Sequence, residues 1–303
     1  MPAREIVVSV SCLTYNHAPF IRQCLDGFMM QKTDFAFEVL IHDDASTDGT
    51  TEIIKEYEAR YPDVIKPIYE EENQWVKGRR GSAVFNFPRA RGKYIALCVG
   101  DDYWTDPLKL QKQVDFLEKN LDFSFCCHRF QEIGSGVNDW ASKTSEVISL
   151  GKFLNGECSI LTLTIMFRYS SLKASNYFQY KIHRDILLYY ALLSQGKCFY
   201  MHDTMGVYRK HAGGVWSLCD SKKKWQMSFS NVLEILNVEN DQRAALYMYI
   251  YLSQSTGRKM LLSHLSSITR AIVKIYRLLG LSYALNVFCA LFFRITPKLS
   301  TNA

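Results

Sequence analysis

Short apolar runs alternate with helix-period patterns along the first half of the chain. Runs rich in β-branched and aromatic residues predict strands, whereas apolar residues spaced three or four apart predict amphipathic helices. The expected strands are residues 6–13, 37–42, 65–69, 94–99, 123–128 and 160–168. The expected helices are residues 21–29 and 51–60, one opened by Asp106-Pro107, and residues 185–195. This alternation predicts an α/β fold with a parallel sheet and helices on both faces.

The pattern becomes helical from about Ser217 onward, without an internal repeat or a low-complexity linker. A chain of 303 residues that is 48% hydrophobic can bury a sizeable core. We therefore expect an α/β domain over residues 1–216 and a helical carboxyl-terminal region over residues 217–303.

Charge and cysteine usage narrow the classes of function. The net charge of +6 comes from dispersed basic residues, which suits a phosphate-bearing ligand or an anionic membrane surface better than nucleic acid. Nine cysteines form an odd number without a CxxC pair, which argues against a disulfide framework or a zinc site. Residues 1–10 lack the basic and apolar regions of a signal peptide, so we expect a cytoplasmic protein.

Paired carboxylates follow two of the expected strands. Asp43-Asp44 comes after residues 37–42, and Asp101-Asp102 comes after residues 94–99. Ligands of open α/β folds bind at the carboxyl edge of the sheet. Adjacent aspartates repel each other unless a cation or hydroxyl groups satisfy them, and hard oxygen ligands favour Mg²⁺ or Mn²⁺. The pattern predicts a crevice for a nucleotide and a metal, although a helix cap and a solvated turn remain alternatives.

Two further segments carry candidate chemistry. Thr14-Tyr15-Asn16 lies where the first strand gives way to a helix, so it can hold a base or form an ordinary turn. Tyr208-Arg209-Lys210-His211 joins cations to the Gly213-Gly214 turn, which is typical of a diphosphate clamp or lid. A lone histidine such as His211 is more often structural than a ligand.

These motifs, in this order, resemble family 2 glycosyltransferases with the GT-A fold. The similarity covers roughly residues 6–216. It implies a Rossmann-like, mixed and mostly parallel sheet with flanking helices, here followed by the helical region. It also implies an inverting transferase that moves a sugar from a nucleotide-diphosphate donor, with a UDP-sugar favoured, to a saccharide or lipid-linked saccharide.

The resemblance implies roles for the motif residues. Tyr15 would stack on the base and Asp44 would bind its ring nitrogen, with Thr14, Asn16 and Asp43 beside them in the nucleotide site. Asp101 would face the ribose or the metal, and Asp102 would lie close to the metal. Arg209 and His211 would close over the diphosphate, with His211 as a third candidate metal ligand.

Val99 departs from the family pattern. Many relatives have an acid two residues before the first of these paired aspartates, and this chain has a valine there. A valine cannot ligate a metal, which leaves a catalytically weakened or non-catalytic nucleotide-sugar binder as the rival function. A dinucleotide-dependent dehydrogenase is disfavoured because no G-x-G-x-x-G follows the first strand.

Inversion requires a carboxylate on the acceptor side of the sugar to deprotonate the attacking hydroxyl. Asp185 begins an expected helix about two dozen residues before Tyr208, where the family places its catalytic acid. We predict Asp185 as the base, although an N-cap role is also compatible with its position. Asp203 is the second candidate.

The last apolar segment bears on the acceptor. Residues 278–293 carry no charge and have basic flanks, but they fall short of the roughly 20 residues of a spanning helix. An interfacial helix on the cytoplasmic leaflet is one interpretation. A helix packed on the catalytic domain or on a second copy in a homo-oligomer is the other. The membrane interpretation favours a lipid-linked acceptor in surface polysaccharide synthesis.

Overall fold

The computed structural model describes residues 5–79, 81–133, 146–158, 160–214, 219–242, 244–248, 265–280 and 284. The strands are β1 (Ile6–Thr14), β2 (Ala36–Asp43), β3 (Ile65–Tyr69), β4 (Tyr94–Leu97), β5 (Tyr103–Trp104), β6 (Phe123–Ile133), β7 (Val147–Ile148), β8 (Met166–Arg168) and β9 (Lys197–Arg209). The main helices are α1 (Ala18–Met29), α2 (Thr50–Arg60), α3 (Ser82–Phe85), α4 (Lys109–Lys119), α5 (Leu150–Leu154), α6 (Tyr169–Ala174), α7 (Asp185–Leu193), α8 (Ser221–Glu239) and α11 (Leu265–Leu279).

One mixed sheet runs through the first part of the chain in the order β3-β2-β1-β4-β8-β6-β9-β5, and β7 also pairs with β9. Strands β3, β2, β1 and β4 are mutually parallel, and β6 is parallel to β9. Strand β8 is antiparallel to both β4 and β6, which reverses the direction at the centre of the sheet. The expectation of a mixed, mostly parallel sheet is therefore confirmed.

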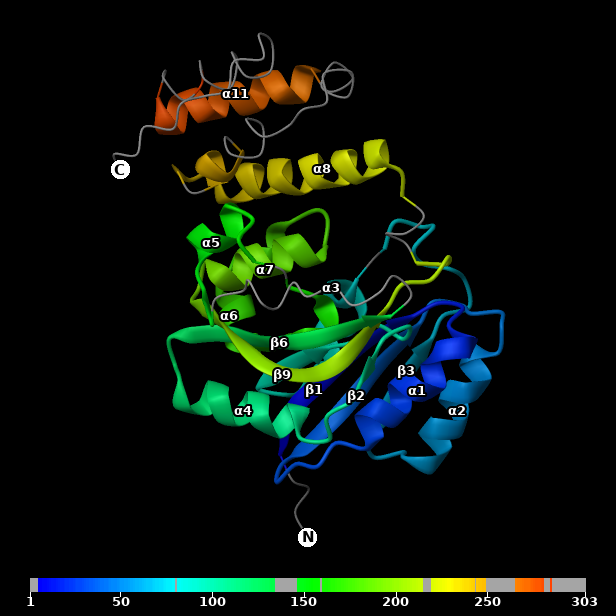
Figure 1. Ribbon diagram of the computed structural model, residues 1–303. Helices are drawn as coiled ribbons and strands as arrows, with labels where there is room; N and C mark the ends of the chain where they lie inside the picture. The colour runs from blue at the N-terminus through cyan, green and yellow to red at the C-terminus, as the bar shows by residue number, and fades with distance from the viewer. Residues whose placement is uncertain are drawn as a thin grey trace. The chain divides into compact units, whose positions relative to one another are not determined.

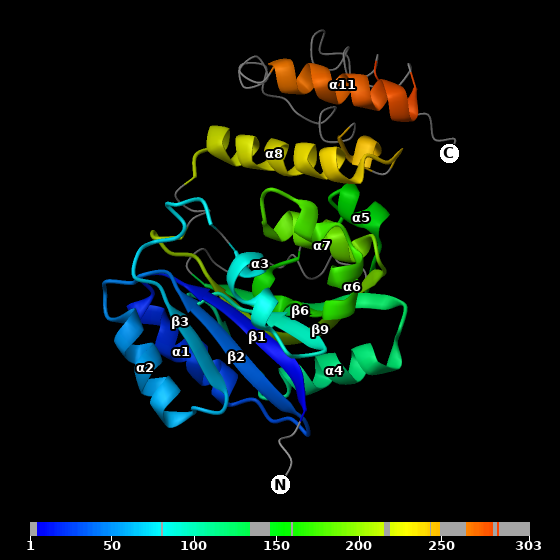
Figure 2. The same ribbon diagram turned by 180° about the vertical axis from the view of Figure 1, so that it is seen from behind.

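Apolar stripes of three helices meet on one face of this sheet. Leu25 and Phe28 of α1, Ile54 of α2, and Leu110 and Val114 of α4 belong to a single buried cluster with strand residues. Figures 1 and 2 show α6 and α7 on the opposite side of β6 and β9 from α4. Helices thus cover both faces, as the alternating sequence pattern predicts.

Two predicted elements differ from the structure. Instead of a strand over residues 160–168, a 3₁₀ turn (Thr162–Thr164) precedes the short β8. The Leu163 carbonyl accepts a hydrogen bond from Trp104 Nε1 at 2.9 Å, and the Thr164 carbonyl accepts one from Gln113 at 3.0 Å. These side-chain donors take the place of a strand ladder, which sequence periodicity does not report.

The helix predicted to open at Asp106-Pro107 begins two residues later, at Lys109. Asp106 forms a turn before it, because its Oδ1 accepts from the Leu108 amide at 2.8 Å. The aspartate therefore satisfies a backbone donor near the helix start, although outside the cap position.

The carboxyl ends of β1, β2 and β4 meet at one edge. Thr14 pairs with Asp43 in register, and the Gly100 amide donates to the Leu13 carbonyl at 3.0 Å. A Cβ atom at Gly100 would lie 2.8 Å from Thr14 Oγ1, so this close approach requires glycine. The two acidic clusters are brought together by this register.

The remaining described residues form a second compact unit that comprises Gln179–Ile182 and the chain from Gly213 onward. Helix α8 begins after Asp220, whose Oδ1 accepts from the Lys223 amide at 2.7 Å. Most of the apolar segment at residues 278–293 lies outside the described residues. Among the helices that are described, none is long and apolar enough to cross a membrane.

Lys109 is fully buried within the first unit. Its Nζ lies 3.9 Å from the Trp104 ring centroid and donates to Gln113 Oε1 at 2.7 Å. The ionisable groups that influence it are Cys98, Cys126 and Asp106, and Lys109 in turn influences the buried His128. Burial lowers the pKa of Lys109 to about 7.

We expect this lysine to give the fold a pH-dependent stability. Between its folded pKa of about 7 and the ordinary value near 10.5, the unfolded chain holds a proton that the folded chain has released. The free energy of unfolding of the natural chain, minus that of Lys109→Met, should rise by about 1 kcal/mol per pH unit over this range. Chemical denaturation at pH 6, 8 and 9 measures it. Exposed Lys119, on the same helix, supplies the control Lys119→Met; a pH-independent difference for Lys109→Met would contradict the prediction.

Candidate active site

Asp43 ends β2 and organises the loop that follows it. Its Oδ1 accepts from the Ser46 amide at 3.3 Å and from Ser46 Oγ at 2.5 Å, and its Oδ2 accepts from the Thr51 hydroxyl. Asp48 in the same loop accepts from the Ala18 amide at 3.0 Å, at the start of α1. The carboxylates of Asp43 and Asp48 therefore hold the backbone and hydroxyls around them, a role that the sequence does not distinguish from ligand binding.

Asp44 is nearly buried, with 8% of its surface exposed. Its Oδ1 accepts from the Gln74 amide at 2.6 Å, and its Oδ2 accepts from the Trp75 amide at 3.1 Å. The Asp44 amide itself donates to the Thr14 carbonyl at 3.0 Å. Asp44 thus joins the end of β1 to the segment that follows β3.

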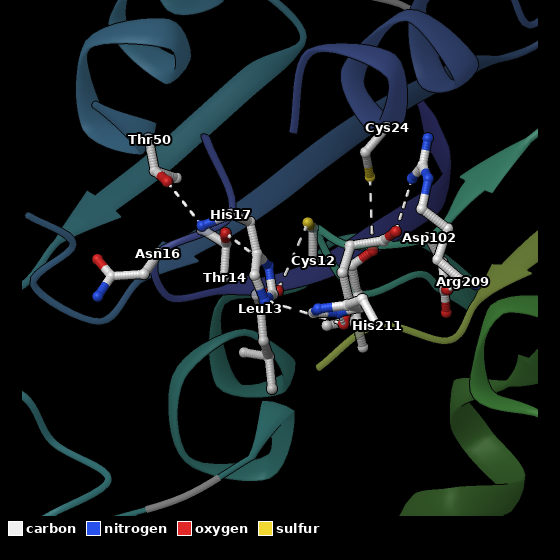
Figure 3. A network of polar contacts seen from close by, with 12 residues as sticks. Cys12, Leu13, Thr14, Asn16, His17, Cys24, Thr50, Asp102, Arg209 and His211 are labelled. Atoms are coloured by element: carbon white, nitrogen blue, oxygen red, sulfur yellow. Dashed lines mark hydrogen bonds and ion pairs between the residues drawn. The ribbon is translucent and has the colours of Figure 1, made fainter. Parts of the chain in front are cut away.

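The turn between β1 and α1 places a second group of predicted residues. Asn16 has a positive φ of 54°, and its Oδ1 accepts from the Thr47 amide at 2.8 Å. Thr14 Oγ1 lies 3.1 Å from His17 Nδ1 (Figure 3). Thr14 and Asn16 therefore hold the turn, whereas the Tyr15 side chain is 45% exposed.

The structure separates the two aspartates that follow β4. Asp101 Oδ2 lies 3.2 Å from His211 Nε2 and 3.9 Å from His17 Nε2. Asp102 is buried, and its Oδ1 accepts from the Arg209 amide at 2.9 Å (Figure 3). The two neighbours have the same local sequence signal, but their different partners leave Asp101 as the carboxylate that faces the histidines.

Burial also changes the pKa values of two side chains in this cluster, Asp102 and His17. Burial, reinforced by the charge of Asp101, raises the pKa of Asp102 to about 8. Burial lowers the pKa of His17, although the Asp101 carboxylate acts in the opposite direction. Near neutral pH the cluster therefore carries fewer charges than its residue types suggest.

Arg209 is the last residue of β9, which pairs antiparallel with β5. Its Nη1 donates to the Asp101 carbonyl at 2.6 Å, and its guanidinium lies 4.2 Å from the Tyr103 ring centroid and 5.4 Å from that of Phe20. A second Nη donates to Gln23. Strand pairing and ring contacts thus hold Arg209 in place, which differs from the flexible clamp that the Gly213-Gly214 turn indicates.

The residues present fit a divalent cation only in part. Asp101 and His211 face each other and supply one oxygen and one nitrogen ligand, of which the carboxylate oxygen suits Mg²⁺ or Mn²⁺. Within the described ranges, no group of three or more His, Cys, Asp or Glu side chains could hold a metal ion. Such a cation is typically bound through one or two protein groups together with substrate phosphates and water. The buried Asp102, engaged with the Arg209 amide, is less suited to direct ligation than the sequence indicates.

Asp185 is the first residue of α7 and is exposed. Thr162 Oγ1 donates to its Oδ2 at 3.3 Å. Burial and the Asp185 charge both raise the pKa of Tyr189 well above its usual value, which places this carboxylate beside a protonated tyrosine. Asp203, the second candidate, lies in the middle of β9 and forms an ion pair with Lys112 of α4 at 2.6 Å.

Two contributors were not predicted from the sequence. Asn86 is fully buried, and its Nδ2 donates to Ser11 Oγ at 3.0 Å and to the Leu40 carbonyl at 3.0 Å. The other is the pair Gln74-Trp75, bound to Asp44. The Asn-Gln-Trp run at residues 73–75, four residues after the end of an expected strand, is the signal that could have identified it.

The sheet order, the meeting of acidic loops at one edge and the position of the Arg209-His211 segment are those expected of the GT-A fold. The family model named Glycosyl transferase family 2 matches residues 9–210, and the chain belongs to this family.

Sequence relatives include proteins with and without a described activity. Uncharacterized protein Rv1520 of Mycobacterium tuberculosis is 36% identical over 233 residues, which are 72% of this chain and 64% of the relative. The chain thus spans less than two thirds of that relative. The Escherichia coli UDP-Glc:alpha-D-GlcNAc-diphosphoundecaprenol beta-1,3-glucosyltransferase WfaP is 28% identical over 244 residues, covering 80% of this chain and 92% of that enzyme.

Solved structures support the fold. Residues 1–349 of TarS from S. aureus, in complex with UDP-GlcNAc, match with a TM-score of 0.69 and 18% identity, covering 94% of this chain and 87% of that one. The mannosyltransferase PcManGT from Pyrobaculum calidifontis, in complex with GDP-Man and Mn²⁺, matches with a TM-score of 0.57 and 16% identity, covering 97% and 89%.

The bonds of Asp44 lead to a testable expectation. In Asp44→Asn, an amide nitrogen replaces one acceptor oxygen, so one backbone N–H of residues 74 and 75 loses its partner at a cost of about 1–3 kcal/mol. The segment after β3 should then open more readily, and trypsin should cleave faster after Lys77 and Arg79. Timed proteolysis with mass spectrometry measures this change. The matched control is Asp63→Asn at an exposed position; equal cleavage rates in both variants would refute the role of Asp44.

Proposed function

We propose that the chain is an inverting glycosyltransferase that moves a sugar from a nucleotide-diphosphate donor, a UDP-sugar, to a saccharide or lipid-linked saccharide. The observation that carries this proposal is the Asp101–His211 pair beside Arg209, at the edge where β1, β2 and β4 end. This arrangement offers two cation ligands and a fixed guanidinium, the groups required to hold a diphosphate.

The relatives favour the donor and acceptor classes. WfaP is named for transfer of glucose from UDP-Glc to a diphosphoundecaprenol-linked sugar, and a TarS structure contains UDP-GlcNAc. The putative teichuronic acid biosynthesis glycosyltransferase TuaG of Bacillus subtilis is 36% identical over 120 residues, 39% of this chain and 45% of that protein. These names favour a role in surface polysaccharide synthesis.

On the donor side, Tyr15 stacks on the base and Asp44 accepts its ring N–H in this proposal. Arg209 is already oriented by Tyr103 and donates toward the diphosphate. Asp101 and His211 would hold Mn²⁺ or Mg²⁺, which would neutralise charge that develops on the leaving diphosphate. Preorganised cations of this kind stabilise charge without reorganising during the reaction.

On the acceptor side, Asp185 takes the proton from the attacking hydroxyl. The acceptor oxygen forms a bond to the anomeric carbon as the bond to the diphosphate oxygen breaks, and attack from the opposite face inverts the configuration. Thr162 donates to Asp185 and orients the carboxylate. Asp185 lies in the first turn of α7, where the partial positive charge of the helix amino terminus attracts a carboxylate.

A peripheral position on the cytoplasmic face of the membrane is part of the proposal. Helix α11 carries Arg270, Lys274 and Arg277 at helical spacing, and its Val273 and Tyr276 side chains are exposed. Basic residues beside exposed apolar groups suit an anionic membrane surface. Such a location would bring the catalytic domain to a lipid-linked acceptor.

Donor binding should depend on the metal ligands. UDP at one hundred times its Kd stabilises a protein by about 2.7 kcal/mol, which raises the melting temperature by several degrees. We expect this increase in melting temperature for the natural chain with UDP and Mn²⁺. In His211→Gln, the difference between the increases measured with Mn²⁺ and with EDTA should be much smaller. Melting curves with UDP, in the presence of Mn²⁺ or EDTA, measure the effect. Equal metal responses in both proteins would remove His211 from the metal site, and no response of the natural chain would refute the proposed donor.

The base assignment can be tested with Asp185→Asn. The amide keeps the size of the side chain but cannot take a proton, so transfer should fall by about 10²–10⁴-fold. UDP affinity should change by no more than about three-fold, since the base faces the acceptor. The matched control is Asp203→Asn, which removes the charge that pairs with Lys112. Transfer that survives in Asp185→Asn but is lost in Asp203→Asn would reverse the assignment, and donor binding without any hydrolysis or transfer by the natural chain would favour the non-catalytic binder.

A further inference from the structure

The segment of residues 73–79 after β3 has a defined shape although much of it is exposed. Asn73 Oδ1 accepts from the Val76 amide at 3.0 Å, and the Trp75 carbonyl accepts from the Gly78 amide at 3.1 Å. The Gln74 carbonyl accepts from the Arg79 amide at 3.0 Å. These bonds close the segment into a compact turn of its own.

Asp44 fixes this turn to the end of β2. Both carboxylate oxygens accept backbone amides, those of Gln74 and Trp75, and Asn73 Nδ2 donates to the Asp44 carbonyl at 3.2 Å. All three bonds leave the Trp75 side chain out. Its indole can therefore be replaced without removing any of these three bonds.

Two exposed aromatic residues are connected to Asp44 through hydrogen bonds that involve the backbone. Tyr15 follows Thr14, whose carbonyl accepts from the Asp44 amide, and Trp75 donates its amide to the Asp44 carboxylate. Tyr15 is 45% exposed and Trp75 is 47% exposed. Both residues are thus tied to the surroundings of Asp44 through the backbone while about half of their surface stays exposed, and ligand pockets are commonly lined by aromatic side chains around a few polar groups.

We propose that Trp75 is a second aromatic residue of the donor-base subsite, which contacts the uracil ring together with Tyr15. This inference rests on the proposed function, in which Asp44 accepts the ring N–H. A carboxylate offers about four acceptor positions, so two backbone amides leave capacity for one more donor. A base bound to Asp44 lies next to the residue whose amide donates to that same carboxylate. The anchored turn thus forms a wall of the base subsite.

The test measures UDP binding by isothermal titration calorimetry in the presence of Mn²⁺. The variants are Trp75→Ala, Trp75→Phe and, as the matched control on the same turn, Val76→Ala, since Val76 is 82% exposed. Inorganic pyrophosphate with Mn²⁺ serves as a probe that lacks the base. Thermal unfolding without ligand checks that each variant folds.

Base–aromatic contacts are strong enough to measure. We expect Trp75→Ala to weaken UDP binding about ten-fold or more, with pyrophosphate binding unchanged. Trp75→Phe should restore most of the affinity, and Val76→Ala should bind UDP as the natural chain does. This pattern would locate the contact at the base.

Other results would overturn the inference. If Trp75→Ala binds UDP as tightly as the natural chain, Trp75 does not contact the base. This conclusion holds even if the variant has a higher KM for the acceptor. A parallel loss of UDP and pyrophosphate would show that Trp75 shapes the diphosphate site. If the natural chain binds pyrophosphate but not UDP, the proposed donor fails and the base subsite with it. If the natural chain and Trp75→Ala both bind UDP equally well, only the role of Trp75 is refuted, and the proposed donor stands.

Discussion

The hydrogen bond from the Arg209 amide to the buried Asp102 carboxylate joins residues that lie 107 positions apart, and the geometry of the site depends on it. It fixes the end of β9 against the loop after β4. His211, two residues further on, then faces Asp101, and the Arg209 guanidinium reaches the Asp101 carbonyl. Because a buried polar group that loses its partner is costly, this contact strongly favours one arrangement of the two segments.

The site divides its carboxylates between scaffold and ligand binding. Asp43 and Asp48 each accept several backbone or hydroxyl donors, and the buried Asp102 accepts the Arg209 amide, so these acids serve the scaffold. Asp101 and Asp185 retain access to solvent, and our proposal assigns the chemistry to them. Asp44 belongs to both groups, since it holds the turn after β3 and has acceptor capacity to spare. A substitution at any of the scaffold acids would disturb the ligand-facing groups indirectly.

The metal site that we propose does not use position 99, where the chain has a valine. The Val99 carbonyl accepts a weak hydrogen bond from Cys24 Sγ at 3.6 Å, so this stretch packs against α1. The candidate ligands lie on Asp101 and His211 instead, which come from two segments that only the sheet brings together. A site shared in this way gains part of its metal affinity from the bound diphosphate.

The sequence by itself determined the α/β class, the family and the edge of the sheet at which the acidic loops meet. Strand and helix periods are local, and the carboxyl ends of parallel strands necessarily share an edge. Tertiary structure alone decided that Asp101 is accessible while Asp102 is buried, that Thr162–Thr164 leaves the strand, and that Gln74 and Trp75 bind Asp44. These outcomes depend on side chains such as Trp104 and Arg209 that arrive from distant segments. Neighbouring residues of one type have the same local signal, and only the donors that the fold brings to each carboxylate distinguish them.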